Sequence, residues 1–123
     1  MTLNCIIVDD SKIQRLSIVK LVENHTSLNL IAEFNSALEC RDALKTYSVD
    51  LIFLDINMPK VNGFDVIHKT QSEITPMVIF ATAYEQYALD AFKVNAVDYI
   101  LKPLDVELLS RAVQRAEDRF SQY

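Results

Sequence analysis

The sequence predicts an α/β domain with a doubly wound, five-stranded parallel sheet and five helices. Short apolar runs alternate with helical patterns along the chain, as in folds whose helices cover both faces of a parallel sheet. Four of the five runs are continuously apolar, which is typical of strands buried on both faces. At 123 residues the chain has the length of one domain, and no repeat or interdomain linker interrupts it.

The strands are expected near residues 3–8, 29–34, 51–54, 77–81 and 98–101. The second run is mixed because it contains Glu33, so we expect this strand at an edge of the sheet. The helices are expected at about 11–25, 36–47, 63–72, 85–94 and 105–120. Ser11 with Gln14, and Ser36 with Glu39, form capping-box patterns that predict where the first two helices begin.

Two of the expected helices carry apolar stripes at helical spacing, which predicts the side that each one buries. In the second helix the stripe consists of Ala37, Cys40, Leu44 and Tyr47. In the last helix it consists of Leu108, Leu109, Ala112, Val113, Ala116 and Phe120. His25 and His68 fall in helical patterns without a partner at ligand spacing, so we interpret both as surface residues.

The composition excludes several classes of protein. A formal charge of −5 argues against a nucleic-acid-binding surface, which needs a basic patch to neutralise phosphates. No apolar stretch approaches the roughly 20 residues of a membrane span, and we see no secretory leader. Cys5 and Cys40 show no metal or redox spacing, so we expect a reducing, cytoplasmic location. The last residues form a helical pattern, which suggests a piece of a longer protein.

Polar residues follow four of the apolar runs directly. Asp9 and Asp10 follow the first run, Asp55 the third, Thr82 the fourth and Lys102 the fifth. In an open parallel sheet, ligands bind beyond the carboxyl ends of the strands. We therefore expect these carboxylates, the hydroxyl and the ammonium to meet at one edge of the sheet, in an arrangement that suits phosphoryl transfer.

The three carboxylates point to a metal site if the first and third strands are neighbours. Like charges placed so close repel one another unless a cation neutralises them. Magnesium is the natural ion, because it uses one or two carboxylates, waters and a phosphoryl oxygen. The chain has a single glycine, Gly63, so it lacks the glycine-rich backbone loop that cradles phosphate in other folds. Asp55 could then be a metal ligand or a nucleophile that forms an acyl phosphate.

Each residue also has a plain structural interpretation. Asp9 and Asp10 could cap the following helix, and Asp55 could start a turn. Thr82 and Glu85 form another capping-box pattern, and one hydroxyl could serve both purposes. A lysine is usually solvated, but Lys102 precedes Pro103, and a cis peptide bond in a tight turn would direct its side chain inward.

The ordered set resembles the response-regulator receiver domains (CheY-like) of two-component phosphorelays over nearly the whole chain. It comprises Asp9-Asp10, Asp55 with Met58-Pro59 and Gly63, Thr82-Ala83 and Lys102-Pro103. Residues 82–92 and 95–103 are most similar to receivers of LytTR-type response regulators. The resemblance implies a flavodoxin-like strand order of 2-1-3-4-5, a single receiver over residues 1–123 and an output domain absent from this chain.

The resemblance also implies a role for each site residue. Asp55 would accept a phosphoryl group from a sensor histidine kinase or phosphotransfer protein. Asp10, Asp55 and the carbonyl of Asn57 would bind Mg²⁺ directly, and Asp9 would bind it through water. Thr82 and Lys102 would contact the phosphoryl oxygens.

Other implied properties concern the surface and the output. Tyr99 would follow Thr82 in the switch by turning inward, and kinase docking would involve the first helix near Lys12 and Arg15. The face formed by helix 85–94, strand 98–101 and helix 105–120 would carry the switch and self-association. The output would be a LytTR-type DNA-binding domain that controls transcription, so the receiver would be a phosphoacceptor switch that touches neither nucleic acid nor membrane.

Three alternatives stay open on the sequence alone. A haloacid-dehalogenase-like phosphohydrolase would use Asp55 as nucleophile, but it needs a second aspartate where Asn57 stands and more chain for a cap. A flavodoxin-like binder of a flavin phosphate needs a phosphate loop that is missing. A receiver that no longer takes phosphate is disfavoured because every acidic and basic position is filled.

Overall fold

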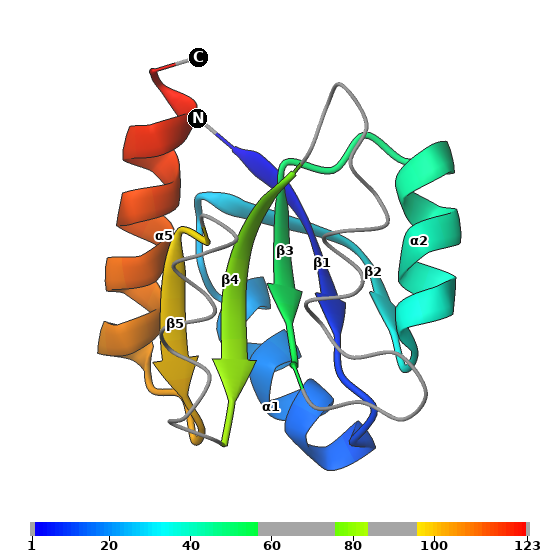
Figure 1. Cartoon of the computed structure of the whole chain (residues 1–123). Coiled ribbons are helices and arrows are strands. Elements are labelled where there is room, and N and C mark those ends of the chain that lie inside the picture. The colour runs from blue at the N-terminus through cyan, green and yellow to red at the C-terminus, as the bar shows by residue number, and fades with distance from the viewer. Residues whose placement is uncertain (1, 57–75, 84–95, 123) are drawn as a thin grey trace.

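The computed structural model describes residues 2–56, 76–83 and 96–122, which form a five-stranded sheet flanked by helices (Figure 1). The strands are β1 (Leu3–Val8), β2 (Leu28–Phe34), β3 (Leu51–Leu54), β4 (Met77–Thr82) and β5 (Asp98–Leu101). The helices are α1 (Lys12–Glu23), α2 (Ala37–Thr46) and α5 (Val106–Phe120). The helices expected at 63–72 and 85–94 lie outside the described residues.

The sheet is parallel with the order β2-β1-β3-β4-β5, as predicted. β2 is therefore an edge strand, and β1 and β3 are neighbours, which is the condition that the predicted metal site requires. The bounds of β1, β3 and β5 agree with the prediction, while β2 begins at Leu28 and β4 continues to Thr82. The bounds of β3 were predictable because all four of its residues are apolar and buried, as in a strand covered on both faces.

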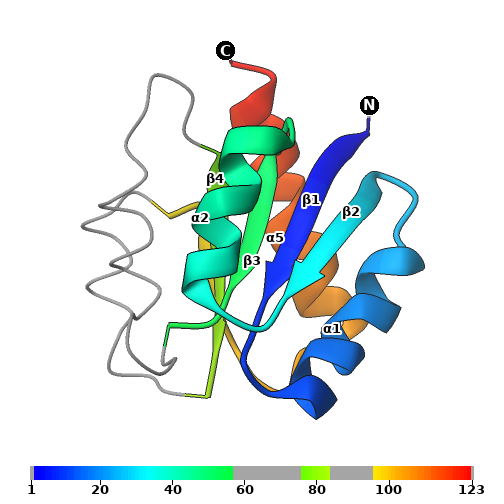
Figure 2. The same ribbon diagram turned by 90° about the vertical axis from the view of Figure 1, so that its right-hand side faces the viewer.

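Helices cover both faces of the sheet, with α1 and α5 on one face and α2 on the other (Figure 2). Alternate residues of each strand point to opposite faces, so the sheet separates two apolar cores. The core under α1 and α5 includes Cys5, Ile7, Phe53, Ile79, Val22 and Leu109. The core under α2 includes Ile6, Val8, Leu54, Phe80 and Cys40. Both cores include residues at or next to the strand ends, such as Val8, Leu54 and Ala81, so packing positions the residues that follow.

The helix ends follow from local capping. The side chains of Ser11, Ser36 and Asp105 each accept a hydrogen bond from the backbone N–H three residues later. The predicted stripe of α5 faces the core, with Leu108 and Phe120 at its margins only partly buried. The stripe of α2 is wrong at Tyr47, which is 49% exposed. Tyr47 is the C-cap and has an extended backbone (φ −101°, ψ 146°), so helical spacing no longer determines where it points. Ala43 is buried in its place.

The strands all end at one edge of the sheet, where the arrowheads lie in Figure 1. α5 runs back against this direction, so it begins near that edge and ends where the strands begin (Figure 1). None of the helices in the described ranges has the length and apolar character that a membrane crossing requires.

Candidate functional site

The register of β1 and β3 places the predicted acidic residues side by side at the ends of the two strands. Val8 of β1 pairs with Leu54 of β3, and each strand ends at that pair. The backbone N–H of Asp55 donates to the carbonyl of Val8 (2.9 Å), so the first residue beyond β3 stays attached to β1. Asp9 and Asp55 are therefore side by side because two buried strands stop in register.

Asp9, Asp10 and Asp55 form an acidic cluster. One carboxylate oxygen from each residue lies within 4.8 Å of the other two. Asp9 and Asp55 are 1% and 7% exposed, whereas Asp10 faces solvent. Carboxylates that approach each other in a partly buried site destabilise one another unless a positive charge balances them. A nearby positive charge would therefore stabilise the cluster, and the exposed side at Asp10 is open to a cation from water.

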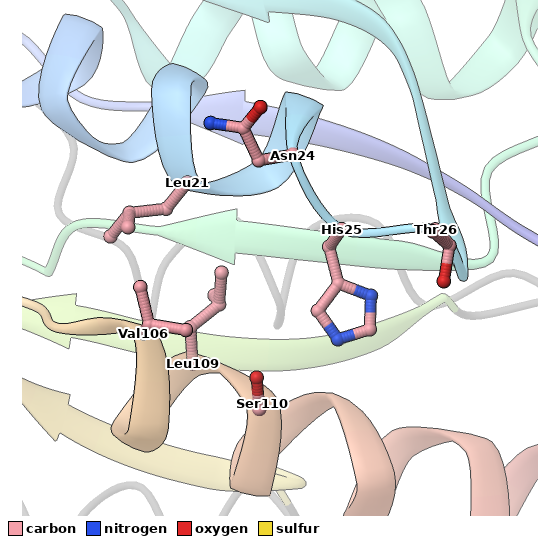
Figure 3. Close-up of a pocket in the computed structure, with 7 residues that line it drawn as sticks. All are labelled: Leu21, Asn24, His25, Thr26, Val106, Leu109 and Ser110. Atoms are coloured by element: carbon pink, nitrogen blue, oxygen red, sulfur yellow. The ribbon is translucent and has the colours of Figure 1, made fainter.

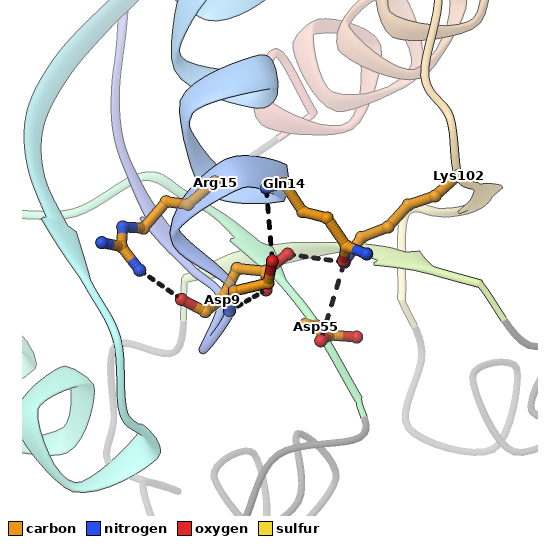
Figure 4. A network of polar contacts seen from close by, with 6 residues as sticks. Asp9, Gln14, Arg15, Asp55 and Lys102 are labelled. Carbon is orange, nitrogen blue, oxygen red and sulfur yellow. Dashed lines mark hydrogen bonds and ion pairs between the residues drawn. The ribbon is translucent and has the colours of Figure 1, made fainter.

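Lys102 supplies one positive charge. Its Nζ lies 2.5 Å from Asp9 Oδ2 and 3.6 Å from Asp55 Oδ2, and only 10% of its side chain is exposed (Figure 4). The peptide bond between Lys102 and Pro103 is cis, as the sequence suggested. The N–H of Lys102 donates to the carbonyl of Thr82 (2.8 Å), which continues the β4–β5 pairing by one residue. The interpretation of Lys102 as a solvated surface lysine is thus wrong.

Gln14 belongs to the site in a way that the sequence did not reveal. Ser11 Oγ accepts the N–H of Gln14 (3.4 Å), but the reciprocal half of the capping box is missing. Instead, the N–H of Ser11 donates to Asp9 Oδ1 (2.9 Å), and Gln14 Oε1 accepts from Lys102 Nζ (2.5 Å). Asp9 replaces the glutamine in the cap, and the glutamine side chain is left to hold Lys102 (Figure 4).

Thr82 and Tyr99 occupy neighbouring strands. Thr82 is the last residue of β4 and is fully buried, opposite Leu101 of β5. Tyr99 is half-buried, pairs with Phe80 and packs against the core under α2. Thr82 therefore lies at the same edge of the sheet as the acidic cluster. Tyr99 lies two residues before the end of β5, farther from that edge. Asn57, whose carbonyl is the other expected direct ligand besides Asp10 and Asp55, lies outside the described residues, and so does Glu85, the predicted capping partner of Thr82.

The residues of the acidic cluster suit a divalent cation. Carboxylate oxygens are the ligands that Mg²⁺ prefers, and this ion keeps several waters, which the exposed side at Asp10 can accommodate. A thiolate-binding ion is not favoured, because Cys5 and Cys40 are buried in the two cores. Burial raises the pKa of both thiols to about 12, so they stay protonated at neutral pH.

A separate cavity of about 240 Å³ lies between the end of α1 and the first turns of α5 (Figure 3). Its lining includes His25 and Ser110 and contains no carboxylate. His25 is half-buried, and its Nδ1 accepts the N–H of Ser27 (3.2 Å), so it is not the plain surface residue that was expected. Because this cavity offers no carboxylate, the acidic cluster is the better candidate for a metal site among the described residues.

Comparison with known proteins identifies the family. Residues 5–114 match the response regulator receiver domain. The chain is 39% identical over 121 residues to the sensory transduction protein LytT of Enterococcus faecalis, covering 98% of this chain and 50% of LytT. It is 32% identical over 110 residues to the transcriptional regulatory protein BtsR of Escherichia coli, covering 89% of this chain and 46% of BtsR. These relatives agree with the expected similarity to LytTR-type receivers.

Comparison with solved structures supports the same family. The response regulatory domain of mrkE from Klebsiella pneumoniae superimposes with a TM-score of 0.89 at 30% identity, covering 98% of this chain and all of that domain. The present chain spans about half the length of the curated relatives it matches. Receiver domains are phosphoacceptor switches that histidine kinases phosphorylate, and an acidic triad of this kind is typical of their magnesium site. The chain therefore belongs to the response regulator receiver domain family of two-component signalling.

Proposed function

We propose that this chain is the receiver of a response regulator that accepts a phosphoryl group on Asp55 from a sensor histidine kinase. The observation that carries the proposal is the setting of the Asp55 carboxylate. It is 7% exposed, lies 3.6 Å from the Lys102 ammonium and belongs to a cluster of three carboxylates. A nucleophile at a strand end, beside a fixed cation, suits the transfer of a negatively charged group.

In the proposed reaction, one Asp55 carboxylate oxygen attacks the phosphorus of a phosphohistidine. The O–P bond forms as the P–N bond breaks, and the imidazole leaves with the electron pair and takes up a proton. Mg²⁺ held by Asp10, Asp55 and the carbonyl of Asn57, and through water by Asp9, would offset the charge on the phosphoryl oxygens. Lys102 would pair with one of these oxygens, and its present contacts with Asp9 and Asp55 keep it within reach.

The output of the switch would be a change of conformation. A phosphoryl group adds about −1.5 to −2 charges at Asp55. The Thr82 hydroxyl at the end of β4 would bind one of the new oxygens, and Tyr99 on the adjacent β5 would turn further inward. The face made by residues 85–94, β5 and α5 would then shift from one populated conformation to another. Self-association of two receivers through this face is part of the proposal.

We further propose that the phosphodonor protein docks on α1. A cavity of about 370 Å³ lies between α1 and the segment after β5, and Lys102 is part of its wall. The apolar side chains around it include Ile13 and Leu104, and Ile13 is 83% exposed. An exposed isoleucine next to the reactive residues suits a partner that must bring its phosphoryl group to Asp55.

The proposal includes a domain assignment, which the lengths of the same relatives support. Residues 1–123 would be a single receiver, and the remaining half of a full-length relative would hold the output domain. We propose a LytTR-type DNA-binding domain there, so that phosphorylation in the cytoplasm would control transcription. The names of LytT and BtsR, a sensory transduction protein and a transcriptional regulatory protein, support this assignment.

The test is incubation with acetyl phosphate and Mg²⁺, followed by intact mass measurement. We expect one added phosphoryl group in the wild type and none in Asp55→Asn. Asp50→Asn is the matched control, because Asp50 precedes β3 and accepts the N–H of Asn4 (2.8 Å) at the opposite end of the strand. Labelling that survives in Asp55→Asn, or steady turnover of a phosphate ester without labelling, would contradict the proposal.

A further inference from the structure

The backbone carbonyl of Asp9 is held by an arginine. Arg15 lies in α1, and its Nη1 donates to the Asp9 carbonyl oxygen at 2.7 Å (Figure 4). Its Nε pairs with Glu33 Oε1 of β2 at 3.0 Å, and 13% of the Arg15 side chain is exposed. One guanidinium therefore connects α1, the edge strand β2 and the end of β1.

We infer that Arg15 is a positioning residue that sets the orientation of the Asp9 and Asp10 carboxylates toward the metal. This inference rests on the proposed function, because it assumes that these carboxylates bind Mg²⁺. Arg15 would act through the backbone and would not touch the ion.

The reason is the peptide unit that the guanidinium holds. The Asp9 carbonyl belongs to the planar peptide that joins Asp9 to Asp10, so fixing its oxygen restricts ψ of the first residue and φ of the second. These two dihedrals set how the Asp9 and Asp10 side chains are oriented relative to each other. Without the bond to Arg15 this peptide could rotate at the free end of β1, where no further strand pairing restrains it.

Every polar atom of Asp9 then has a partner. Its N–H donates to the Phe34 carbonyl (3.1 Å), and its carbonyl accepts from Arg15 (2.7 Å). Oδ1 accepts the N–H of Ser11 (2.9 Å), and Oδ2 accepts from Lys102 (2.5 Å). In Figure 4 Arg15 and Lys102 approach Asp9 from opposite sides. Such complete anchoring of a buried carboxylate defines a ligand position before any ion arrives.

The contribution of Arg15 is geometric more than electrostatic. The side chain of Glu33 is 38% exposed, so solvent screens its ion pair with Arg15 and the pair contributes little to stability. The charge of Arg15 should even oppose Mg²⁺ binding, because two cations near one site repel each other. If Arg15 positions the carboxylates, removing it should weaken Mg²⁺ binding. If only its charge matters, removing it should strengthen Mg²⁺ binding, so the experiment separates the two roles.

The experiment compares Arg15→Met and Arg15→Lys with the wild type over the full chain. Methionine is a long side chain that favours helix but donates no hydrogen bond. Lysine keeps the positive charge but lacks the planar guanidinium that donates to the Asp9 carbonyl and to Glu33 at once. Arg115→Met is the matched control, since Arg115 in α5 also pairs with a strand carboxylate, Asp98, at 3.0 Å. Mg²⁺ affinity is measured by calorimetric titration.

A second readout needs no metal. The amide of Ser11 donates to Asp9 Oδ1, so its hydrogen exchange in metal-free protein reports whether that carboxylate stays in place. We expect faster exchange at Ser11 in both Arg15 variants, and unchanged exchange at the amide of Lys102, which donates to the Thr82 carbonyl. If Arg15 only stabilised the fold as a whole, its replacement would speed exchange at the amides of Ser11 and Lys102 alike.

We expect Arg15→Met to weaken Mg²⁺ binding about tenfold, the size seen when a residue behind a metal ligand is removed. Arg15→Lys should weaken it less, because its ammonium can still donate one hydrogen bond to the Asp9 carbonyl. Arg115→Met should leave Mg²⁺ binding unchanged. Unchanged or tighter binding in Arg15→Met would overturn the inference. A wild-type protein that binds no Mg²⁺ would instead contradict the metal site of the proposed function, and Ser11 exchange would still test the positioning by Arg15.

Discussion

At the scale of the residue, Lys102 joins the parts of the site. A lysine ammonium has three donors, and Nζ of Lys102 reaches Asp9, Gln14 and Asp55. The inward direction of this lysine was predictable, because it follows a buried strand and precedes a proline. Its contact with Gln14 was not, because the reach of a glutamine across 88 positions depends on where the fold places α1.

The Lys102→Ala variant tests this central cation. We expect it to fold but to lose about 1.5–3 kcal/mol of stability, the usual cost of removing a charged hydrogen bond from a buried group. Labelling by acetyl phosphate, or the conformational response to it, should be strongly impaired. Urea unfolding and intact mass measurement check the two parts separately. A variant with wild-type labelling and a wild-type response would contradict the role of Lys102.

At the scale of the element, the agreement between sequence and structure depends on the kind of element. Continuous apolar runs marked the buried strands to within a residue, since both faces of each strand are covered. Capping serines marked the starts of α1 and α2 equally well. The error at Tyr47 arose where the chain leaves the helix, a point that spacing cannot reveal. The bond from Arg15 to Asp9 was also missed, because it depends on how α1 packs beside β1 and β2.

The proposed docking surface on α1 gives a prediction at this scale. Ile13→Ser should slow phosphotransfer from a kinase that phosphorylates the wild type, while labelling by the small donor acetyl phosphate should be unchanged. The reason is that only a protein donor needs the exposed apolar side chain next to Lys102. Leu38→Ser is the control, because Leu38 is an exposed residue (46%) of α2 on the other face of the sheet. Equal slowing in both variants would argue against a specific surface on α1.

At the scale of the whole molecule, the sheet separates two cores and directs all strand ends to one edge. Each core holds one cysteine, and neither thiol is exposed. The acidic cluster could be predicted from the sequence because it depends only on strand order and register. Roles that depend on residues 57–75 and 84–95, including Asn57, remain predictions because these residues lie outside the described part of the chain.

The two thiols make a pH-dependent prediction for the whole fold. Burial raises the pKa of Cys5 and Cys40 from 9.0 to about 12, so the folded state keeps both protonated where the unfolded chain ionises them. Their contribution to stability is therefore complete below pH 9 and is lost as the pH rises from 9 to about 12.

The free energy of unfolding, measured in urea on both sides of pH 9, checks this loss of stability. Thiol labelling checks the burial that causes it. At pH 8 we expect a disulfide reagent to modify the folded protein only as fast as it unfolds, and to modify both cysteines at once in urea. Fast labelling of the folded protein at pH 8 would show that at least one thiol is accessible, and would contradict this description of the cores.

The central claim is that the ends of β1 and β3 hold one divalent cation together. Crystals of the protein soaked in Mn²⁺, which replaces Mg²⁺ and has a measurable anomalous signal, test it most directly. We predict a single anomalous peak in contact with the carboxylates of Asp10 and Asp55, which disappears in Asp55→Asn. A peak elsewhere on the surface, or no peak between these two carboxylates, would contradict the account.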